Sequence, residues 1–348
     1  MYLGIIGLPG SGRSTVFAAL SGARGEKVQN VSSRTEPLRT SLTVFDERIP
    51  ILTERYKPKK TTYARIDYLL PFAAHSQQES KAESAIWNQL RTCDALLHVV
   101  RNFGMDGLAE PDPESAFWSL EEEMVLSDLL VAEKRIERIE LDRKRGKKPE
   151  GEEFDLIMKA HERLEKGEPL RSVPELALHQ ALRGFTFLSA KPMLVVVNND
   201  DETTGFKAWN RIPDMVDILA VRGRLEMEIA AMTPEESAEF RTAYGIEKSA
   251  VDRIIAGSYR LLDRISFFTV GPDEVRAWPI AAGTPAVDAA GAVHTDMKKG
   301  FIRAEVLAYD DFMILGGFQE AKKAGKVRLE GKDYIVKDGD IITFRFNI

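Results

Sequence analysis

The first two thirds of the chain alternate short, continuous apolar runs with segments of helical spacing. Apolar runs of four to eight residues are typical of strands that are buried on both faces of a parallel sheet. Because helical segments separate these runs, the pattern predicts an α/β fold with a mostly parallel sheet. The six expected strands cover residues 2–6, 42–45, 63–70, 95–101, 192–198 and 216–221.

Residues 117–145 follow a different pattern, with apolar side chains at helical spacing and no glycine or proline. A polar, basic turn comes next, and residues 154–164 then resume the amphipathic helical pattern. Two helices joined by a short turn pack antiparallel. We therefore expect an inserted α-helical hairpin between the fourth and fifth strands, followed by a helical return to the sheet over residues 176–188.

Beyond residue 266 the pattern changes again, because short strands alternate with glycine-containing turns. Residues 310–324 interrupt this pattern with a segment that is partly helical. We expect a compact α+β module of about eighty residues, which is the scale of a small domain. Its expected strands cover residues 266–270, 274–280, 300–307, 327–329, 334–336 and 341–346.

Composition and charge narrow the class of protein. The 348 residues are 44% hydrophobic and 29% charged, which is typical of a soluble globular protein with two or three domains. The net charge of -6 argues against a uniformly basic nucleic-acid binder. No apolar run reaches the ~20 residues of a membrane span, the N-terminus lacks a secretory signal pattern, and the single Cys93 cannot form an intramolecular disulfide. We expect a cytoplasmic protein.

The segment after the first strand carries the clearest chemistry. It reads Gly7-Leu8-Pro9-Gly10-Ser11-Gly12-Arg13-Ser14 and fits the phosphate-binding pattern G-x-x-x-x-G-K-[ST], except that arginine replaces lysine. Glycines let backbone N–H groups wrap a phosphate in front of a helix N-terminus, whereas a bare strand–helix turn would hold no ligand. The strand before and the helix after favour the phosphate loop. The residues expected to bind nucleotide here are Gly7, Pro9, Gly10, Ser11, Gly12, Arg13, Ser14 and Thr15.

The phosphate loop and several stretches of the C-terminal module resemble the YchF family of Obg-related P-loop proteins, of which this chain would be a divergent member. The C-terminal stretches are residues 267–278, 290–296, 300–306 and 325–340. The resemblance runs nearly end to end and implies ATP or GTP with Mg²⁺ as ligand and association with ribosomes. It also implies a domain order: a P-loop domain in two parts, 1–115 and 190–265, a helical hairpin, 116–189, and a ubiquitin-like β-grasp (TGS) domain, 266–348.

Several positions depart from the family pattern. The resemblance places Asp67 in the D-x-x-G motif as a Mg²⁺ ligand beside Ser14, but Leu70 replaces the glycine and residues 72–85 contain no glycine. The base-recognition loop keeps Asn198 and Asp201 as base contacts, while Asn199 stands where N-K-x-D has its lysine. The resemblance favours adenine, and the residues alone leave adenine and guanine open. No catalytic residue is expected.

Three functions follow from these observations. The first is a nucleotide-binding regulator of translation with weak or no hydrolysis, at most a weak ATPase or GTPase. The second is a pseudo-NTPase scaffold that has lost nucleotide and acts only through protein or RNA contacts. The third, an NTPase that uses Arg13 as an arginine finger, ranks last because one side chain would also have to grip the phosphates.

Basic residues at the end of the expected hairpin are the candidate contact to ribosomal RNA, together with the TGS domain. Phosphate backbones attract such clusters, although turn charges of this kind are equally often only solvated. The residues concerned are Arg143, Lys144, Arg145, Lys147 and Lys148.

Overall fold

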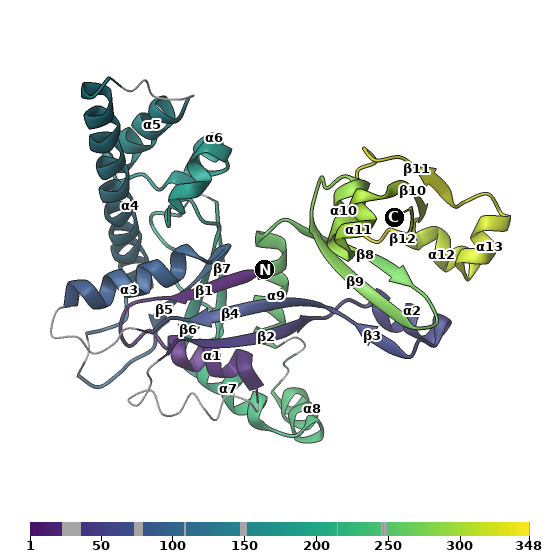
Figure 1. The fold of residues 1–348 in the computed structure, drawn as a ribbon. Coiled ribbons are helices and arrows are strands. Elements are labelled where there is room, and N and C mark those ends of the chain that lie inside the picture. Colours follow the sequence, from purple (N-terminus) through teal and green to yellow (C-terminus); the bar gives the residue numbers. More distant parts are fainter. Residues whose placement is uncertain are drawn as a thin grey trace. The chain divides into compact units, whose positions relative to one another are not determined.

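The computed structural model shows two compact units, each built on its own six-stranded sheet (Figure 1). The first unit consists of Met1–Leu42 and Asp67–Leu261, and the second of Thr43–Ile66 and Leu262–Ile348. The structure describes residues 1–22, 36–72, 79–107, 109–146, 152–213, 215–244, 246 and 249–347.

The sheet of the first unit has the strand order β2-β4-β1-β5-β6-β7. Strand β1 runs parallel to both β4 and β5, and β6 runs parallel to β5 and β7, which confirms the expected parallel-rich α/β fold. The strands are β1 (Tyr2–Ile6), β2 (Leu38–Val44), β4 (Ala64–Leu70), β5 (Ala95–Asn102), β6 (Met193–Asn199) and β7 (Val216–Val221). All six lie where the apolar runs predicted them, although β2 begins four residues earlier.

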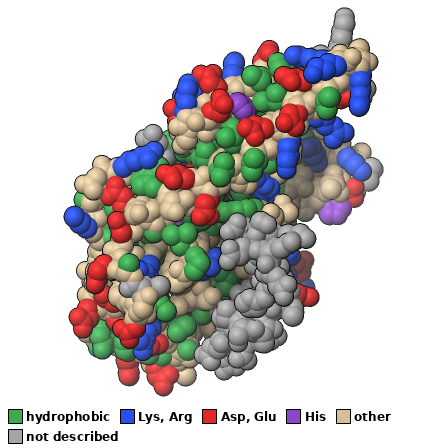
Figure 2. All heavy atoms as spheres, turned by 90° about the vertical axis from the view of Figure 1, so that its left-hand side faces the viewer, with side chains coloured by type: hydrophobic (Ala, Val, Ile, Leu, Met, Phe, Trp, Pro, Cys, Tyr) green, Lys and Arg blue, Asp and Glu red, His purple; other side chains and the backbone are tan. Residues whose placement is uncertain are grey.

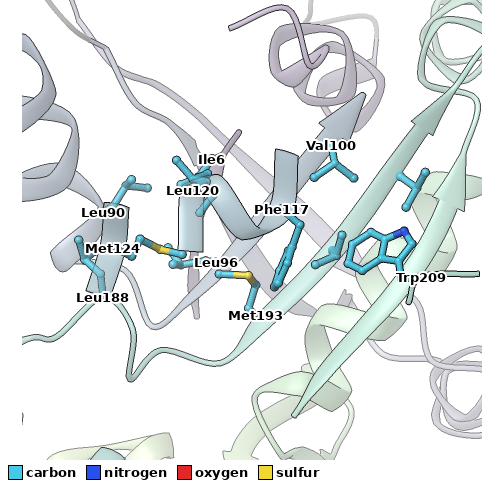
Figure 3. Packing of buried hydrophobic residues seen from close by; sticks show 12 residues of the cluster. Ile6, Leu90, Leu96, Val100, Phe117, Leu120, Met124, Leu188, Met193 and Trp209 are labelled. Carbon is cyan, nitrogen blue, oxygen red and sulfur yellow. The ribbon is translucent and has the colours of Figure 1, made fainter. Parts of the chain in front are cut away.

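Both faces of this sheet are covered by helices. On one face, Leu96 and Val100 of β5 pack with Phe117 and Leu90 in a buried cluster (Figure 3). Successive strand residues point to opposite faces, and on the other face Gly257 lies against Leu194. Apart from the short α6 (Pro174–Ala177), the helices of this unit outside the hairpin are α1 (Arg13–Ser21), α3 (Glu79–Arg91), α7 (Gly223–Ala231), α8 (Pro234–Ala243) and α9 (Ala250–Leu261).

The helical hairpin consists of α4 (Pro113–Lys144) and α5 (Glu153–Glu165). Asp112 accepts a hydrogen bond from the Ser115 backbone N–H and caps α4, with proline at the first helical position. Between the helices, the Arg135 guanidinium donates to both carboxylate oxygens of Glu153 at 2.6 and 3.0 Å. Their shared apolar seam includes Ala132, Ile139, Ile157, Ala160 and Leu164.

The helical return expected over residues 176–188 is wrong in detail. In place of one helix, the chain forms three short helical pieces: the 3₁₀ helices η3 (Leu170–Ser172) and η4 (Gln180–Phe185) and the one-turn α6 (Pro174–Ala177). Thr186 has φ 50°, which ends the helical path, and the buried Asp128 accepts the backbone N–H groups of Leu188 and Ser189 at 3.0 and 2.7 Å. These buried side chain to backbone bonds fix the path of the chain at Leu188 and Ser189, just before β6.

The sheet of the second unit has the order β11-β10-β12-β8-β9-β3. The expected strand at 334–336 is absent, since only an isolated bridge joins Pro285 and Ile335 there. The strands are β3 (Lys60–Thr62), β8 (Arg264–Val270), β9 (Glu274–Ala281), β10 (Phe301–Leu307), β11 (Arg328–Glu330) and β12 (Ile341–Phe346). The helices are α2 (Arg48–Tyr56), α10 (Ala286–Val293), α11 (Thr295–Lys299), α12 (Tyr309–Leu315) and α13 (Phe318–Lys323).

Two elements of the second unit, α2 and β3, come from residues 43–66 and were not expected from the sequence. Strand β3 pairs in parallel with β9, and α2 buries Ile49 and Leu52 completely. The Arg48 guanidinium donates to Asp46 and to Asp338 and lies 4.9 Å from the centre of the Phe268 ring. The segment is therefore an integral part of the second unit.

Within the described residues, no helix is both long and apolar enough to cross a bilayer. The same residues contain no group of three or more His, Cys, Asp or Glu side chains arranged to hold a metal ion. Cys93 is buried, as expected for a core position, and burial raises the pKa of its thiol to about 11.

Candidate functional site

The phosphate-loop sequence forms the turn between β1 and α1 in the first unit. Gly10 and Gly12 have φ values of 78° and 89°, a left-handed conformation that favours glycine. Gly7 lies so close to the Val99 carbonyl that a Cβ atom would not fit. The turn is closed by the Ser11 backbone N–H, which donates to the Leu8 carbonyl at 3.1 Å, while Gly10 stays exposed.

Helix α1 begins directly after this turn, with Arg13, Ser14 and Thr15 in its first turn. The first backbone N–H groups of a helix have no intrahelical partner, and here Gly12 supplies no capping side chain and the first turn holds no acidic residue. The helix N-terminus is therefore open to an anion. All eight loop residues that the sequence predicted lie in this turn and the first turn of α1.

Asn198 joins the phosphate loop to the neighbouring strand end. Its amide nitrogen donates to the Ser11 carbonyl at 3.1 Å, and its amide oxygen accepts the Gly223 backbone N–H at 3.0 Å. A Cβ atom on Gly12 or Gly223 would collide with this amide. The sequence predicted Asn198 as a base contact, whereas in the structure it is a buried clamp between two loops.

Asn199 has a similar internal role. Its amide nitrogen donates to the carbonyls of Thr203 and Gly205 at 3.0 and 2.7 Å, and its oxygen accepts from the Asn102 amide at 2.8 Å. The loop after β6 is thus held from inside, and Asn199 cannot cover a base as a lysine stem would. Asn102 was not singled out in the sequence, because only the sheet places the end of β5 beside the end of β6.

Asp200 and Asp201 of this loop differ in their hydrogen bonds. The Asp200 carboxylate accepts the backbone N–H groups of Glu202 and Thr203 at 3.1 and 2.7 Å, and the hydrogen bonds from Thr203 lower its pKa. Asp201, the predicted base contact, is exposed at the end of β6. Its carboxylate is accessible to a ligand, whereas that of Asp200 shapes the turn.

His98 lies in the middle of β5, completely buried and stacked on Phe117 with ring centres 5.4 Å apart. Within the described part of the chain neither ring nitrogen has a hydrogen-bond partner. Burial, with smaller contributions from the charges of Arg171 and Arg13, lowers the pKa of His98 to about 3. The ring is therefore neutral at physiological pH. Arg13 of the phosphate loop lies near enough for its charge to lower the pKa of His98.

Replacement of His98 by leucine is expected to make folding less sensitive to acid. The folded pKa is about 3 and the unfolded value is ~6.5, so the unfolded chain binds more protons between these pH values and stability falls as the pH drops. Between pH 7.5 and 4.5 this group should remove about 2.5 kcal/mol of stability from the natural chain. Urea unfolding at both pH values measures the difference, and equal losses in chain and variant would contradict it.

Comparison with known proteins identifies the family. Residues 264–347 match the family model YchF-GTPase_C, described as "Protein of unknown function (DUF933)". The "Ribosome-binding ATPase YchF" of Bacillus subtilis is 36% identical, and that of Haemophilus ducreyi 38%, each alignment covering 99% of both chains. The chain belongs to the YchF family. A solved structure entitled "Structure of the Schizosaccharomyces pombe YchF GTPase" has a TM-score of 0.79 at 26% identity and covers 99% of this chain and 97% of that one.

One predicted metal ligand of this YchF-family chain does not reach the phosphate loop. Asp67 pairs with Tyr2 in the parallel register of β4 and β1, five residues before the loop begins at Gly7. At about 3.3 Å per residue, that register separates Asp67 from the loop by roughly 16 Å along the strand. The prediction that Asp67 would join Ser14 at a metal ion is therefore not supported, because the strand reaches the loop with Leu70 instead.

Proposed function

We propose that this YchF-family protein is a cytoplasmic, nucleotide-binding regulator that associates with the ribosome. It binds ATP or GTP at the phosphate loop and hydrolyses it slowly or not at all. The observation that carries nucleotide binding is the open turn before α1, with two left-handed glycines facing an uncapped helix N-terminus. Backbone N–H groups in such a turn bind phosphate oxygens, and the Arg13 charge beside them favours an anion.

The metal and the base are held by few side chains in this proposal. Ser14 supplies a hydroxyl oxygen for Mg²⁺, and the remaining ligands are water and phosphate oxygens. Asp201 is the accessible acidic group at the base, and Asn199 is engaged inside its own loop. We therefore expect weak discrimination between adenine and guanine.

We expect slow hydrolysis because of the residues at the end of β4. In a working site a carboxylate and a glycine after this strand position the metal and the γ-phosphate. Here β4 ends at Leu70 and Pro71 follows, so neither group is present at these positions. A turnover assay with several cycles per protein molecule would overturn this part of the proposal.

Replacement of Ser14 by alanine is expected to weaken binding of ATP and GTP about tenfold in the presence of Mg²⁺. The change removes one metal ligand, and one charge-assisted contact is worth about 1.5–3 kcal/mol. Without Mg²⁺ the variant and the natural chain should bind nucleotide equally. Isothermal titration calorimetry with and without Mg²⁺ measures both differences.

Ser21, at the other end of α1, provides the matched control for that experiment. Its hydroxyl donates to the Phe17 carbonyl at 2.8 Å, so Ser21→Ala removes the same atom from the same helix away from the loop. Binding should be unchanged in this control. If the natural chain binds no nucleotide at millimolar concentration, the hypothesis of a pseudo-NTPase scaffold replaces that of a nucleotide-binding regulator.

The second contact in the proposal is the hairpin end. Figure 2 shows basic side chains gathered at the upper end of this face, where the hairpin ends. Arg143 and Lys144 lie in the last turn of α4, Arg145 is exposed, and Lys147 and Lys148 lie outside the described residues. The names of the relatives, ribosome-binding ATPases, support the ribosome as the target. Phosphates of its RNA are the groups that a basic cluster attracts.

Reversal of two charges at the hairpin end, with Arg143→Glu and Lys144→Glu, is expected to reduce ribosome co-sedimentation at least tenfold at 50 mM salt. Each lost phosphate contact also lowers the salt dependence of binding by about one unit of slope. The matched control is Lys134→Glu with Arg138→Glu, which reverses two exposed charges earlier in the same helix. Equal losses in both variants would exclude the hairpin end as the specific contact.

A further inference from the structure

A cavity of about 630 Å³ lies in the first unit at the base of the helical hairpin. The first turns of α4 form one wall, residues 168–175 form a second and residues 211–213 form a third. No lining residue belongs to the phosphate loop. The wall residue Phe117 stacks on His98 of β5, so the cavity borders the core of the sheet.

Two charged side chains in the cavity wall form an incomplete ion pair. Arg171 and Glu121 are 5% and 2% exposed, and Arg171 Nη1 donates to Glu121 Oε1 at 2.5 Å. Arg171 Nε donates to the Lys191 carbonyl, but Arg171 Nη2 and Glu121 Oε2 have no hydrogen-bond partner among the described residues. A bidentate arginine–carboxylate pair would also have joined Arg171 Nη2 to Glu121 Oε2. The wall therefore keeps a buried donor and a buried acceptor unsatisfied, which costs about 1–3 kcal/mol for each group.

Other residues that line the cavity offer a flat surface and a positive charge. The Arg211 guanidinium lies 3.4 Å from the centre of the Trp118 ring, and Val173 and Ile212 add apolar surface beside it. Arg211 is exposed, and its guanidinium forms no ion pair within the part of the chain that the structure describes, although its backbone N–H donates to Glu114 Oε1 at 2.7 Å. The Trp118 indole N–H is buried and equally without a partner there. A ligand that suits these groups is planar and carries an anion.

We propose that this cavity binds a nucleotide through its base, at a site separate from the phosphate loop. Every nucleobase has an edge with an acceptor next to a donor, which matches Arg171 Nη2 and Glu121 Oε2. The flat base packs against the Trp118 and Ile212 side of the cavity, and Arg211 at the exposed rim contacts the phosphate. A free nucleoside monophosphate and an unstacked nucleotide of an RNA strand share this chemistry.

The test uses the full chain labelled with 5-fluorotryptophan, observed by ¹⁹F NMR. The chain has four tryptophans, and Trp118→Phe assigns the resonance of interest. Titration with AMP should shift the Trp118 resonance, and ribose 5-phosphate should not. A shift with AMP identifies a free nucleotide, and a shift only with a six-nucleotide oligoadenylate identifies an RNA strand. No shift with either probe up to 10 mM, or an equal shift with ribose 5-phosphate, would overturn the proposal.

Two variants test the contacts. Glu121→Gln should raise the Kd of the active probe about tenfold and Arg211→Met about fivefold, as expected for lost charge-assisted contacts. The matched control is Arg224→Met, an exposed arginine of the same unit, for which the Kd should not change. Arg211 is on the surface, so its variant stays informative if Glu121→Gln lowers stability. Equal affinities in all three variants would exclude the site.

A last comparison separates the cavity from the phosphate loop. Arg13→Ala removes the loop charge and should leave the Trp118 response unchanged. If this variant abolishes the response, the nucleotide acts from the phosphate loop and the cavity proposal fails, while the proposed function stands. If the response persists although the chain binds no ATP, the cavity proposal stands and the proposed function fails.

Discussion

A fragment of residues 262–348 is expected to be largely unfolded by itself, although it contains the whole region, 264–347, matched by the family model. The fragment lacks α2 and β3, so Phe268 loses the Arg48 guanidinium above its ring and β9 loses its edge partner. Ile49 and Leu52 are fully buried in the same unit. Burial of these two side chains contributes about 3–6 kcal/mol, which is a large part of the stability of a small domain.

The measurement is the dispersion of amide resonances in a ¹⁵N–¹H spectrum, together with a thermal melt. The matched control is a single chain in which residues 43–66 are joined to 262–348 through a flexible linker. This control should give a dispersed spectrum and a cooperative melt. A cooperative melt of the shorter fragment, at the temperature of the control, would show that residues 43–66 add little to the second unit.

Replacement of Gly12 by alanine is expected to weaken ATP and GTP binding about a hundredfold or more. Gly12 has φ 89°, where a side chain costs about 1–2 kcal/mol. The new methyl group would also displace the Asn198 amide, which joins Ser11 to Gly223 through two buried hydrogen bonds worth about 1–3 kcal/mol. The two effects together amount to about 2–5 kcal/mol, and a hundredfold change in Kd corresponds to about 2.7 kcal/mol.

Calorimetric titration of Gly12→Ala with nucleotide measures this effect, and a thermal melt shows that the variant is folded. Gly184→Ala is the matched control, because Gly184 has no positive φ and no atom within 4 Å of an added Cβ. Asn198→Ala should weaken binding too, since both loops lose their common partner. Unchanged affinity in Gly12→Ala would mean that the phosphate loop does not bind the nucleotide.

The strands of the first unit could be predicted because their apolar runs are continuous. A strand covered by helices on both faces needs apolar side chains at nearly every position, as in the fully buried β6. The two hairpin helices follow for a similar reason, because their apolar positions recur at helical spacing without a break. The phosphate loop was predictable from its glycines, since the left-handed backbone at Gly10 and Gly12 favours that residue.

The predictions that failed depend on contacts between distant residues. The segment over 176–188 has helix-forming residues, but its helical path ends at Thr186, and Asp128, some sixty residues away, fixes the backbone of Leu188 and Ser189. Asp67 fits a metal motif in sequence, yet the register of β4 beside β1 places it opposite Tyr2. Neither a buried hydrogen bond across sixty residues nor a strand register is contained in a local pattern.

The sequence by itself determined the class of fold, the order of its parts, the position of the phosphate loop and the family, because each of these depends on local spacing or on residue identity. Only the tertiary structure decided that residues 43–66 belong with the C-terminal module, that Asn198 clamps two loops, and that Glu121 and Arg171 line one cavity. The physical reason is that sheet order and helix packing bring together residues that are far apart in the chain. A local pattern specifies which residues form an element, but the burial of apolar surface decides which elements meet.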